Sequence, residues 1–219
     1  MIHFPNRTRT EMRNQLILNV GRPDVQAYLI DILDRLLTNH KITFIKWDMN
    51  RNVSEPGWPD APGDPRELWV RYVQGLYHVW GTLAKRHPHI FWQTCSGGGG
   101  RADFGMLHLA DQVWVSDNTE ATARFGHQYG FSQIFPAMVM ESQVTHMGNP
   151  PAPLEFRFHV SMMGVLGISS DLMHWTPEEL ASGANQIDCT GNPPRRATRR
   201  SIPATACPRS AVHRHTICQ

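Results

Sequence analysis

The sequence predicts an α/β fold in which parallel strands are joined by helices. Short apolar runs rich in β-branched and aromatic residues alternate with longer segments of helical spacing, and polar residues collect where the apolar runs end. Strands and helices in alternation indicate parallel strands with crossover connections. The predicted strands are Gln15–Val20, Ile42–Trp47, Ile90–Thr94, Gln112–Ser116 and Gln133–Ala137.

Two architectures fit this alternation, a doubly wound sheet and a (β/α)8 barrel. Both folds bind their ligands at the carboxyl ends of the strands. The residues that follow the predicted strands are therefore the first candidates for a functional site.

The segments between the strands have the spacing of amphipathic helices. Segment 24–39 repeats apolar residues three or four apart, with Pro23 at its first turn. Segment 64–86 repeats the pattern, and Asp64 is expected to cap its amino terminus. Three further helices are predicted at Glu120–Tyr129, Pro153–Met163 and Thr176–Asn185.

Length and composition indicate a globular chain without a membrane segment. The chain has 219 residues, 41% of them hydrophobic, which is enough for one domain or a large piece of one. Its apolar runs are shorter than a membrane span. It has four cysteines, no zinc-finger spacing and no secretory signal at its start. We therefore expect no disulfide framework, no metal site, no membrane partner and a cytoplasmic location.

The formal net charge of +2 is unevenly distributed along the chain. Residues 188–219 hold six arginines and one acid, whereas residues 1–187 hold 15 basic and 18 acidic side chains, a net charge of −3. The body of the chain therefore gives no support to nucleic-acid binding. Segment 188–219 also lacks helical and strand periodicity. It is either a disordered natural tail or the product of a shifted reading frame, and the abrupt break favours the second.

The second predicted strand ends in Lys46, Trp47 and Asp48. Asp48 could be a helix cap or a structural acid, but Met-Asn-Arg follows it rather than a helix start. Lys46 stands two residues before it and therefore on the same face of the strand. A nearby ammonium group favours the ionised carboxylate, which is the form that a nucleophile requires.

Asp117 follows the fourth predicted strand and has two interpretations. It could cap the helix that begins near Glu120, or it could form a catalytic pair with Asp48. Two carboxylates at neighbouring strand ends suit glycosidic bond cleavage, in which one attacks the anomeric carbon and the other protonates the leaving oxygen. Trp47 and Trp114 could offer an apolar platform to a sugar ring, although a strand tryptophan can equally belong to the core.

The third predicted strand is followed by Cys95 and the sequence SGGGGR. A phosphate-binding loop, and with it a nucleotide-binding module, is one interpretation, but the GK[ST] ending of such loops is missing. The glycines would also let the backbone approach a ligand closely, with Arg101 behind them. Cys95 could be a nucleophile, yet no histidine stands at an obvious partnering position, so we favour a role in lining a pocket.

Several motifs, in their order and spacing, resemble the catalytic domain of the α-galactosidases of glycoside hydrolase family 36, the melibiases. They are RNQLILNVGRPDV, FIKWDMNR, CSGGGGRADFGML, WVSDNTEATARFGHQYG and RFHVSMMGVLGISSDL, within about residues 9–187. The resemblance implies a (β/α)8 barrel, here incomplete and running from about strand 3 to strand 8. It also implies retaining hydrolysis of terminal α-D-galactosyl groups without a cofactor.

By this resemblance, Asp48 is the nucleophile and Asp117 the general acid/base. Lys46 resembles the lysine that hydrogen-bonds the sugar beside the nucleophile, and the loop from Cys95 to Arg101 resembles the segment that packs near the sugar 2-position. The residues assigned to substrate binding are Lys46, Trp47, Asn50, Cys95, Ser96, Gly98 and Arg101, and Arg51 is given a supporting role.

Two departures from the family pattern leave the substrate preference open. Gln93 precedes the Cys-Ser loop where relatives often have Glu, and Glu120 stands where they have Asp. The expected ligand is an α-galactoside or a galacto-oligosaccharide, with α-N-acetylgalactosaminidase or galactosyl-transfer activity as alternatives. Because members of the family are much longer, a truncated non-catalytic remnant or a carbohydrate-binding fragment is a further alternative. A homo-oligomer is compatible with the full-length enzyme.

Overall fold

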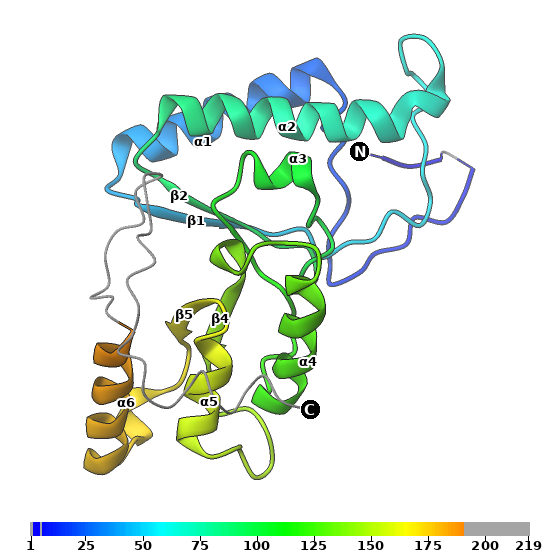
Figure 1. Cartoon of the computed structure of the whole chain (residues 1–219). Helices are drawn as coiled ribbons and strands as arrows, with labels where there is room; N and C mark the ends of the chain where they lie inside the picture. Colours follow the sequence, from blue (N-terminus) through cyan, green and yellow to red (C-terminus); the bar gives the residue numbers. More distant parts are fainter. Residues whose placement is uncertain (1, 5, 191–219) are drawn as a thin grey trace. The chain divides into compact units, whose positions relative to one another are not determined.

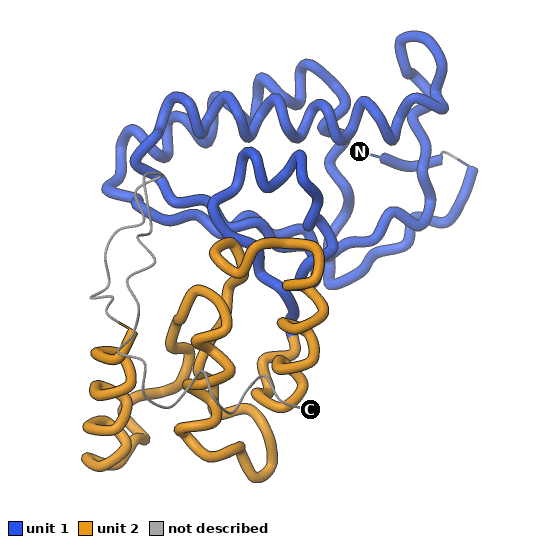
Figure 2. The backbone as a smooth tube through the Cα atoms, viewed as in Figure 1, with its two compact units in different colours: residues 1–117 blue, residues 118–219 orange. Residues whose placement is uncertain are grey.

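The computed structural model describes residues 2–4 and 6–190, which belong to two compact units (Figures 1 and 2). Unit 1 comprises residues 1–117 and unit 2 residues 118–219. The tail predicted at 188–219 lies outside the described residues from residue 191 onward. Asp188 and Cys189 still belong to the preceding helix, so helical structure continues past the expected boundary.

Unit 1 is built on a three-stranded parallel sheet in the order β1, β2, β3. β1 is Phe44–Trp47, β2 is Phe91–Thr94 and β3 is Gln112–Val113. The predicted mixed α/β class with parallel strands is therefore confirmed. The third strand is two residues long, but the N–H of Trp114 donates to the carbonyl oxygen of Thr94 at 2.9 Å and continues the ladder.

Two long helices run side by side along one face of this sheet (Figure 1). They are α1 (Pro23–Asn39) and α2 (Leu68–Arg86); the shorter η1 (Pro65–Glu67) precedes α2, and α3 (Phe104–Leu107) precedes β3. Both long helices were predicted from their apolar spacing. Their apolar faces and the sheet enclose a core that contains the buried side chains of Trp80, Leu83 and Trp92.

The start and the middle of the α2 segment show how the sequence fixes its position. Asp64 accepts a hydrogen bond of 2.9 Å from the backbone N–H of Arg66, so the predicted cap is present, although it serves the η1 turn that leads into α2. Further along, a side chain at Gly75 would overlap the carbonyl oxygen of Val20. The glycine therefore lets the chain before α1 pass directly against the helix.

Unit 2 repeats the strand and helix alternation. Its two parallel strands are β4 (Glu141–Val144) and β5 (Val165–Ile168). Its helices are α4 (Ala121–Ser132), η2 (Ala137–Val139), α5 (Leu154–Ser161), η3 (Leu172–His174) and α6 (Pro177–Cys189). Thr176 and Glu179 form a reciprocal capping box at the start of α6, which explains why that helix begins where the sequence predicts it.

Two predicted strands are wrong. Segment Gln15–Val20 forms no strand in the structure, and the carbonyl oxygen of Ile17 accepts from the N–H of Ile2 at 3.0 Å. A run with high strand propensity becomes a strand only beside a hydrogen-bonded neighbour, and no strand of the described residues pairs with it.

Segment Gln133–Ala137 ends α4 instead of forming a strand. The N–H of Gln133 bonds back to the carbonyl oxygen of Gly130, and Phe135 packs on Phe131 with ring centroids 4.8 Å apart. Pro136 cannot donate to a strand ladder. In the described part of this unit the strands are β4 and β5, and neither was among the predicted strands.

Among the described residues, no helix has both the length and the apolar character needed to cross a membrane.

Candidate functional site

The polar residues of the candidate site share one face of the unit 1 sheet. Lys46 pairs in register with Gln93, and Gln93 with Gln112. Because alternate residues of a strand point to opposite faces, Asp48 and Trp114 follow on the same side. Trp47 points to the other side, where its ring stacks on that of Trp80 with centroids 5.0 Å apart. The helices thus cover the apolar face, and the polar face carries the strand-end groups.

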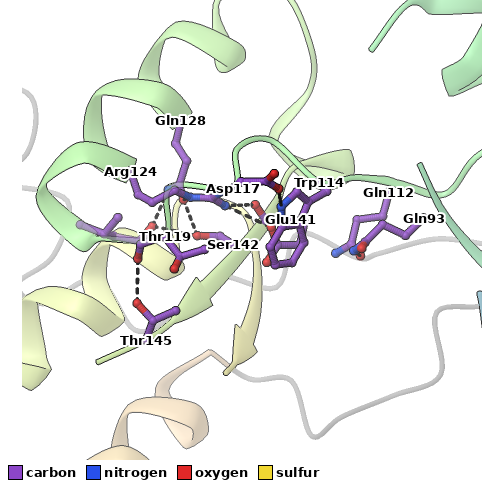
Figure 3. A network of polar contacts seen from close by, with 11 residues as sticks. Gln93, Gln112, Trp114, Asp117, Thr119, Arg124, Gln128, Glu141, Ser142 and Thr145 are labelled. Carbon is purple, nitrogen blue, oxygen red and sulfur yellow. Dashed lines mark hydrogen bonds and ion pairs between the residues drawn. The ribbon is translucent and has the colours of Figure 1, made fainter. Parts of the chain in front are cut away.

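Two glutamines join the second and third strands at the base of this face. Nε2 of Gln93 donates to Oε1 of Gln112 at 2.6 Å, and both side chains are buried (Figure 3). Sequence reasoning noted Gln93 but missed Gln112, since its partner is set by the register of two strands.

The Asp48 carboxylate is surrounded by groups that favour its ionised form. Nδ2 of Asn50 donates to Oδ2 of Asp48 at 2.7 Å. Partial burial of Asp48 opposes ionisation, but hydrogen bonds from the Cys95 thiol, the Asn50 amide and the Met49 N–H outweigh it, with help from the charge of Lys46. Together they hold the pKa of Asp48 below its usual value. The carboxylate is therefore charged at neutral pH while its side chain remains exposed.

The loop after β2 connects all three strand ends. Oγ of Ser96 donates to the carbonyl oxygen of Met49 at 2.8 Å, and the N–H of Gly97 donates to Oδ1 of Asn50 at 3.0 Å. On the other side, the N–H of Gly99 donates to the carbonyl oxygen of Val115 at 3.0 Å. The loop therefore fixes the chain after β1 and the chain after β3 in one arrangement.

The glycines of this loop serve close packing. Gly98 has φ +91°, and a Cβ there would lie 2.9 Å from Cα of Ser116. The N–H groups of Gly97 and Gly99 already have the partners just described, and that of Gly100 donates to the carbonyl oxygen of Ser96 at 3.2 Å. A phosphate cradle needs several N–H groups directed at the anion, so this geometry disfavours the phosphate-loop interpretation.

Arg101 braces the strand ends from below the loop. Its Nη2 donates to the carbonyl oxygens of Trp47 and Cys95, the latter at 2.8 Å. Desolvation lowers the pKa of Arg101, in part offset by Tyr72, Asp48 and Cys95. Its guanidinium is thus held against the backbone next to Asp48. There it joins the end of β1, at Trp47, to the residue after β2, Cys95.

Cys95 is a neutral group of the site. Its side chain is buried, and burial together with the neighbouring Asp48 raises the pKa of the thiol to about 11. The thiol is therefore protonated at neutral pH and donates to the Asp48 carboxylate. A nucleophilic role would require the thiolate, so the geometry disfavours it.

Asp117 lies at the end of β3 with a side-chain partner of its own. Nε1 of Trp114 donates to Oδ1 of Asp117 at 2.9 Å (Figure 3). The side chain that caps α4 is that of Glu120, which accepts from the N–H groups of Thr122 and Ala123. The capping interpretation of Asp117 is therefore wrong, and its exposed carboxylate remains at the strand end.

Arg51 and Met49 anchor the chain that follows Asp48. Arg51 donates to the carbonyl oxygen of Thr10 and to Glu55, which ties this segment to the amino-terminal segment. The hydroxyl of Tyr72, on α2, donates to Sδ of Met49 at 3.1 Å. The contact of Tyr72 could not be predicted from local sequence patterns, because it joins residues that are far apart in the chain.

Unit 2 has a buried polar network of its own (Figure 3). Arg124 of α4 pairs with Glu141 of β4 at 3.2 Å, with both side chains almost fully buried. Gln128 donates to the carbonyl oxygen of Val160 at 2.7 Å and accepts from Oγ of Ser142 at 2.5 Å. These contacts join α4, β4 and α5, which indicates a structural role.

In the described part of the chain, no three His, Cys, Asp or Glu side chains lie close enough together to bind a metal ion.

Comparison with known proteins gives consistent matches to one family. The Melibiase family model matches residues 1–193. The α-galactosidase AgaA of Geobacillus stearothermophilus is 43% identical over 191 residues, which cover 85% of this chain and 26% of that protein. α-Galactosidase C of Emericella nidulans is 41% identical over 167 residues, which cover 74% of this chain and 21% of that protein.

Solved structures give the same result. The crystal structure of the family 36 enzyme AgaA matches with a TM-score of 0.81 at 41% identity, covering 85% of this chain and 27% of that one. The α-galactosidase of Lactobacillus brevis matches with a TM-score of 0.81 at 33% identity, covering 85% and 26%. AgaA variants have been crystallised with stachyose and with raffinose. The chain spans about a quarter of the length of the relatives it matches.

Proposed function

The chain belongs to the melibiase family, and from this premise we propose that it is the catalytic segment of an α-galactosidase. The proposed reaction is retaining hydrolysis of terminal, non-reducing α-D-galactosyl groups of galacto-oligosaccharides. The observation that carries the proposal is the ionised Asp48 carboxylate at the carboxyl end of β1, in the motif that the family uses for its nucleophile. Raffinose and stachyose, which are bound to relatives, indicate the substrate class.

The corresponding architecture is a (β/α)8 barrel from about strand 3 to strand 8. In this assignment β1 to β5 are strands 4 to 8, and the segment Gln15–Val20 occupies the position of strand 3. The alternation of β1, α2, β2, α3, β3, α4, β4, α5, β5 and α6 along the chain supports it. The catalytic groups then stand at the carboxyl ends of strands 4 and 6, which is where such barrels place them.

The first step of the proposed mechanism forms a covalent intermediate. A carboxylate oxygen of Asp48 attacks the anomeric carbon, the bond to the leaving oxygen breaks, and Asp117 gives its proton to that oxygen. In the second step Asp117 takes a proton from water, the water oxygen attacks the anomeric carbon, and the ester bond to Asp48 breaks. Two inversions leave the configuration of the sugar unchanged.

The remaining assigned residues divide by the face of the sheet that they occupy. Lys46, Asn50 and Cys95 contact or approach the Asp48 carboxylate, so we propose that they contact the galactosyl group beside the nucleophile. Ser96 and Gly98 shape the loop that would border the sugar. Trp47 packs on the helix side of the sheet, and Arg101 is bonded to backbone carbonyl oxygens. We propose that both residues position the groups that contact the sugar.

The test uses the full-length protein that contains this chain. It is expected to release galactose from raffinose, and Asp48→Ala should lower kcat by about 10⁴-fold or more, since no covalent intermediate can form. Azide should restore part of that activity on an aryl galactoside by replacing the missing carboxylate. Asp31→Ala, an exposed acid on α1 paired with Arg35, is the matched control and should retain full activity.

Two results would refute the proposal. A folded full-length protein that cleaves neither raffinose nor an aryl α-galactoside is not an α-galactosidase; the alternatives are then a carbohydrate-binding remnant or a related activity. A fully active Asp48→Ala variant would show that another residue is the nucleophile.

A further inference from the structure

Trp114 contacts two of the groups assigned to the reaction, and it does so with different parts of its side chain. Its Nε1–H donates to Oδ1 of Asp117 at 2.9 Å. The face of its ring carries the ammonium group of Lys46, with Nζ 3.4 Å from the ring centroid. Trp114 is thereby in contact both with the acid/base at the end of β3 and with the lysine next to the nucleophile on β1.

The indole contact distinguishes the two oxygens of Asp117. An indole N–H can only donate, so the oxygen that faces it must accept. When Asp117 is protonated, its proton cannot lie between Oδ1 and the indole N–H, because two hydrogens would then face each other. Because the carbonyl oxygen of a carboxylic acid is a better acceptor than its hydroxyl oxygen, the contact favours Oδ1 as the carbonyl oxygen and Oδ2 as the oxygen that carries the proton. The same hydrogen bond restrains rotation of the carboxyl group.

The contact with Lys46 helps to orient the indole ring of Trp114, and with it the N–H donor. A cation over the face of an indole is attracted by the ring electrons, which favours one orientation of the ring plane. The direction of the N–H toward Asp117 thus depends on a side chain two residues before Asp48.

We propose that Trp114 is a positioning residue that directs Oδ2 of Asp117, and with it the catalytic proton, toward the leaving oxygen. This inference rests on the proposed function of Asp117. It predicts that loss of the indole N–H impairs proton donation in particular, while loss of a merely structural contact would weaken all reactions of the site equally.

The experiment compares two substrates in the full-length protein. Cleavage of raffinose needs a proton on the leaving sugar oxygen, whereas the leaving group of 2,4-dinitrophenyl α-D-galactoside departs readily without one. Trp114→Phe keeps an aromatic face for Lys46 and removes the donor. We expect kcat/KM for raffinose to fall about tenfold, and kcat/KM for the dinitrophenyl substrate to fall less than about threefold.

A second variant separates the loss of the N–H donor from the loss of packing. Benzothienylalanine at position 114 has the shape of tryptophan with sulfur in place of the N–H, and it should give the same selective loss as Trp114→Phe. Trp69→Phe, at a tryptophan on α2 that is 52% exposed, is the matched control and should leave both substrates unaffected.

The outcomes separate this inference from the proposed function. Equal losses on both substrates, or no loss on raffinose in either variant, would overturn the role of Trp114. If the unaltered full-length protein cleaves neither substrate, the proposed function itself fails.

Discussion

Asn50 holds the Asp48 carboxylate and the glycine loop at the same time. Its Nδ2 donates to Oδ2 of Asp48 at 2.7 Å, while its Oδ1 accepts from the N–H of Gly97 at 3.0 Å. The amide is therefore used from both ends, and its orientation is fixed because only one end can donate. A residue that the sequence places merely near Asp48 thus connects that carboxylate to the loop of the neighbouring strand.

Asn50→Asp should move the acid limb of the pH profile. The change removes the donor and places a second carboxylate beside Asp48, and both effects raise the pKa of Asp48 from its lowered value. Since Asp48 must be ionised to act as the proposed nucleophile, activity that is lost as pH falls through the pKa of Asp48 should be lost at higher pH in the variant. The measurement is kcat/KM against pH in the full-length protein.

The control for this change is Asn52→Asp, at an exposed position two residues further along. It adds the same charge to the same segment and should leave the acid limb in place. An unchanged acid limb in Asn50→Asp would show that the amide does not stabilise the ionised form of Asp48.

Arg101→Met should destabilise the 219-residue chain. It removes the charged donor shared by the carbonyl oxygens of Trp47 and Cys95, which keep only their backbone partners, the N–H groups of Cys95 and Met49. We expect the free energy of unfolding to fall by about 1.5–3 kcal/mol, typical of the loss of hydrogen bonds to a charged group. Urea denaturation measures this loss, with Arg35→Met as control because the ion pair of Arg35 with Asp31 on α1 is exposed. Equal stability of the two variants would contradict a bracing role.

How far the sequence predicts this molecule depends on the range of the interactions. Helices α1 and α2 are set by apolar spacing, which is local, with Pro23 at the start of α1 and Pro65 in the turn that leads into α2. Both are found close to their predicted bounds. Strands depend on partners elsewhere in the chain. Apolar residues at Ile134 and Phe135 imitate a strand, yet Phe135 serves the end of α4.

The same distinction applies to the candidate site. The rule that ligands bind at the carboxyl ends of strands singles out Asp48 and Asp117 from the sequence alone. The contact of Lys46 with Trp114 could not be predicted, because it joins β1 to the end of β3 and depends on the register of three strands. The bracing by Arg101 likewise depends on a fold that brings two strand ends together.

Gly98→Ala should distort the loop that borders Asp48. Its φ of +91° is unfavourable for alanine, and the new Cβ would lie 2.9 Å from Cα of Ser116, which is backbone and cannot move aside alone. We expect a loss of about 1–3 kcal/mol in the free energy of unfolding of the chain and a lower kcat/KM in the full-length protein.

Gly126→Ala provides the matched control, since it lies inside α4 and, apart from its chain neighbours and the backbone of its own helix, no heavy atom lies within 4 Å of the added Cβ. Alanine is the better helix former there and should stabilise the chain by up to about 1 kcal/mol. If both alanine variants changed stability in the same direction, the close approach of the loop to β3 would not be what Gly98 provides.

Glu55 should make the stability of the chain depend on pH below about 4.5, which is the pKa of a glutamate in the unfolded chain. Hydrogen bonds from Thr10, Ser54 and Arg51 lower the pKa of Glu55 to about 2. The folded state therefore binds fewer protons than the unfolded state in this interval, so the contribution of Glu55 to stability is fully present above pH 4.5 and is lost as the pH falls toward 2.

Glu55→Gln should flatten the fall in melting temperature over this interval. Glu155→Gln, at an exposed acid at the start of α5, serves as the control. Melting curves recorded from pH 6 to pH 2 decide the matter, because an unchanged slope in Glu55→Gln would mean that the contacts of Arg51 and Thr10 do not stabilise the segment that follows Asp48.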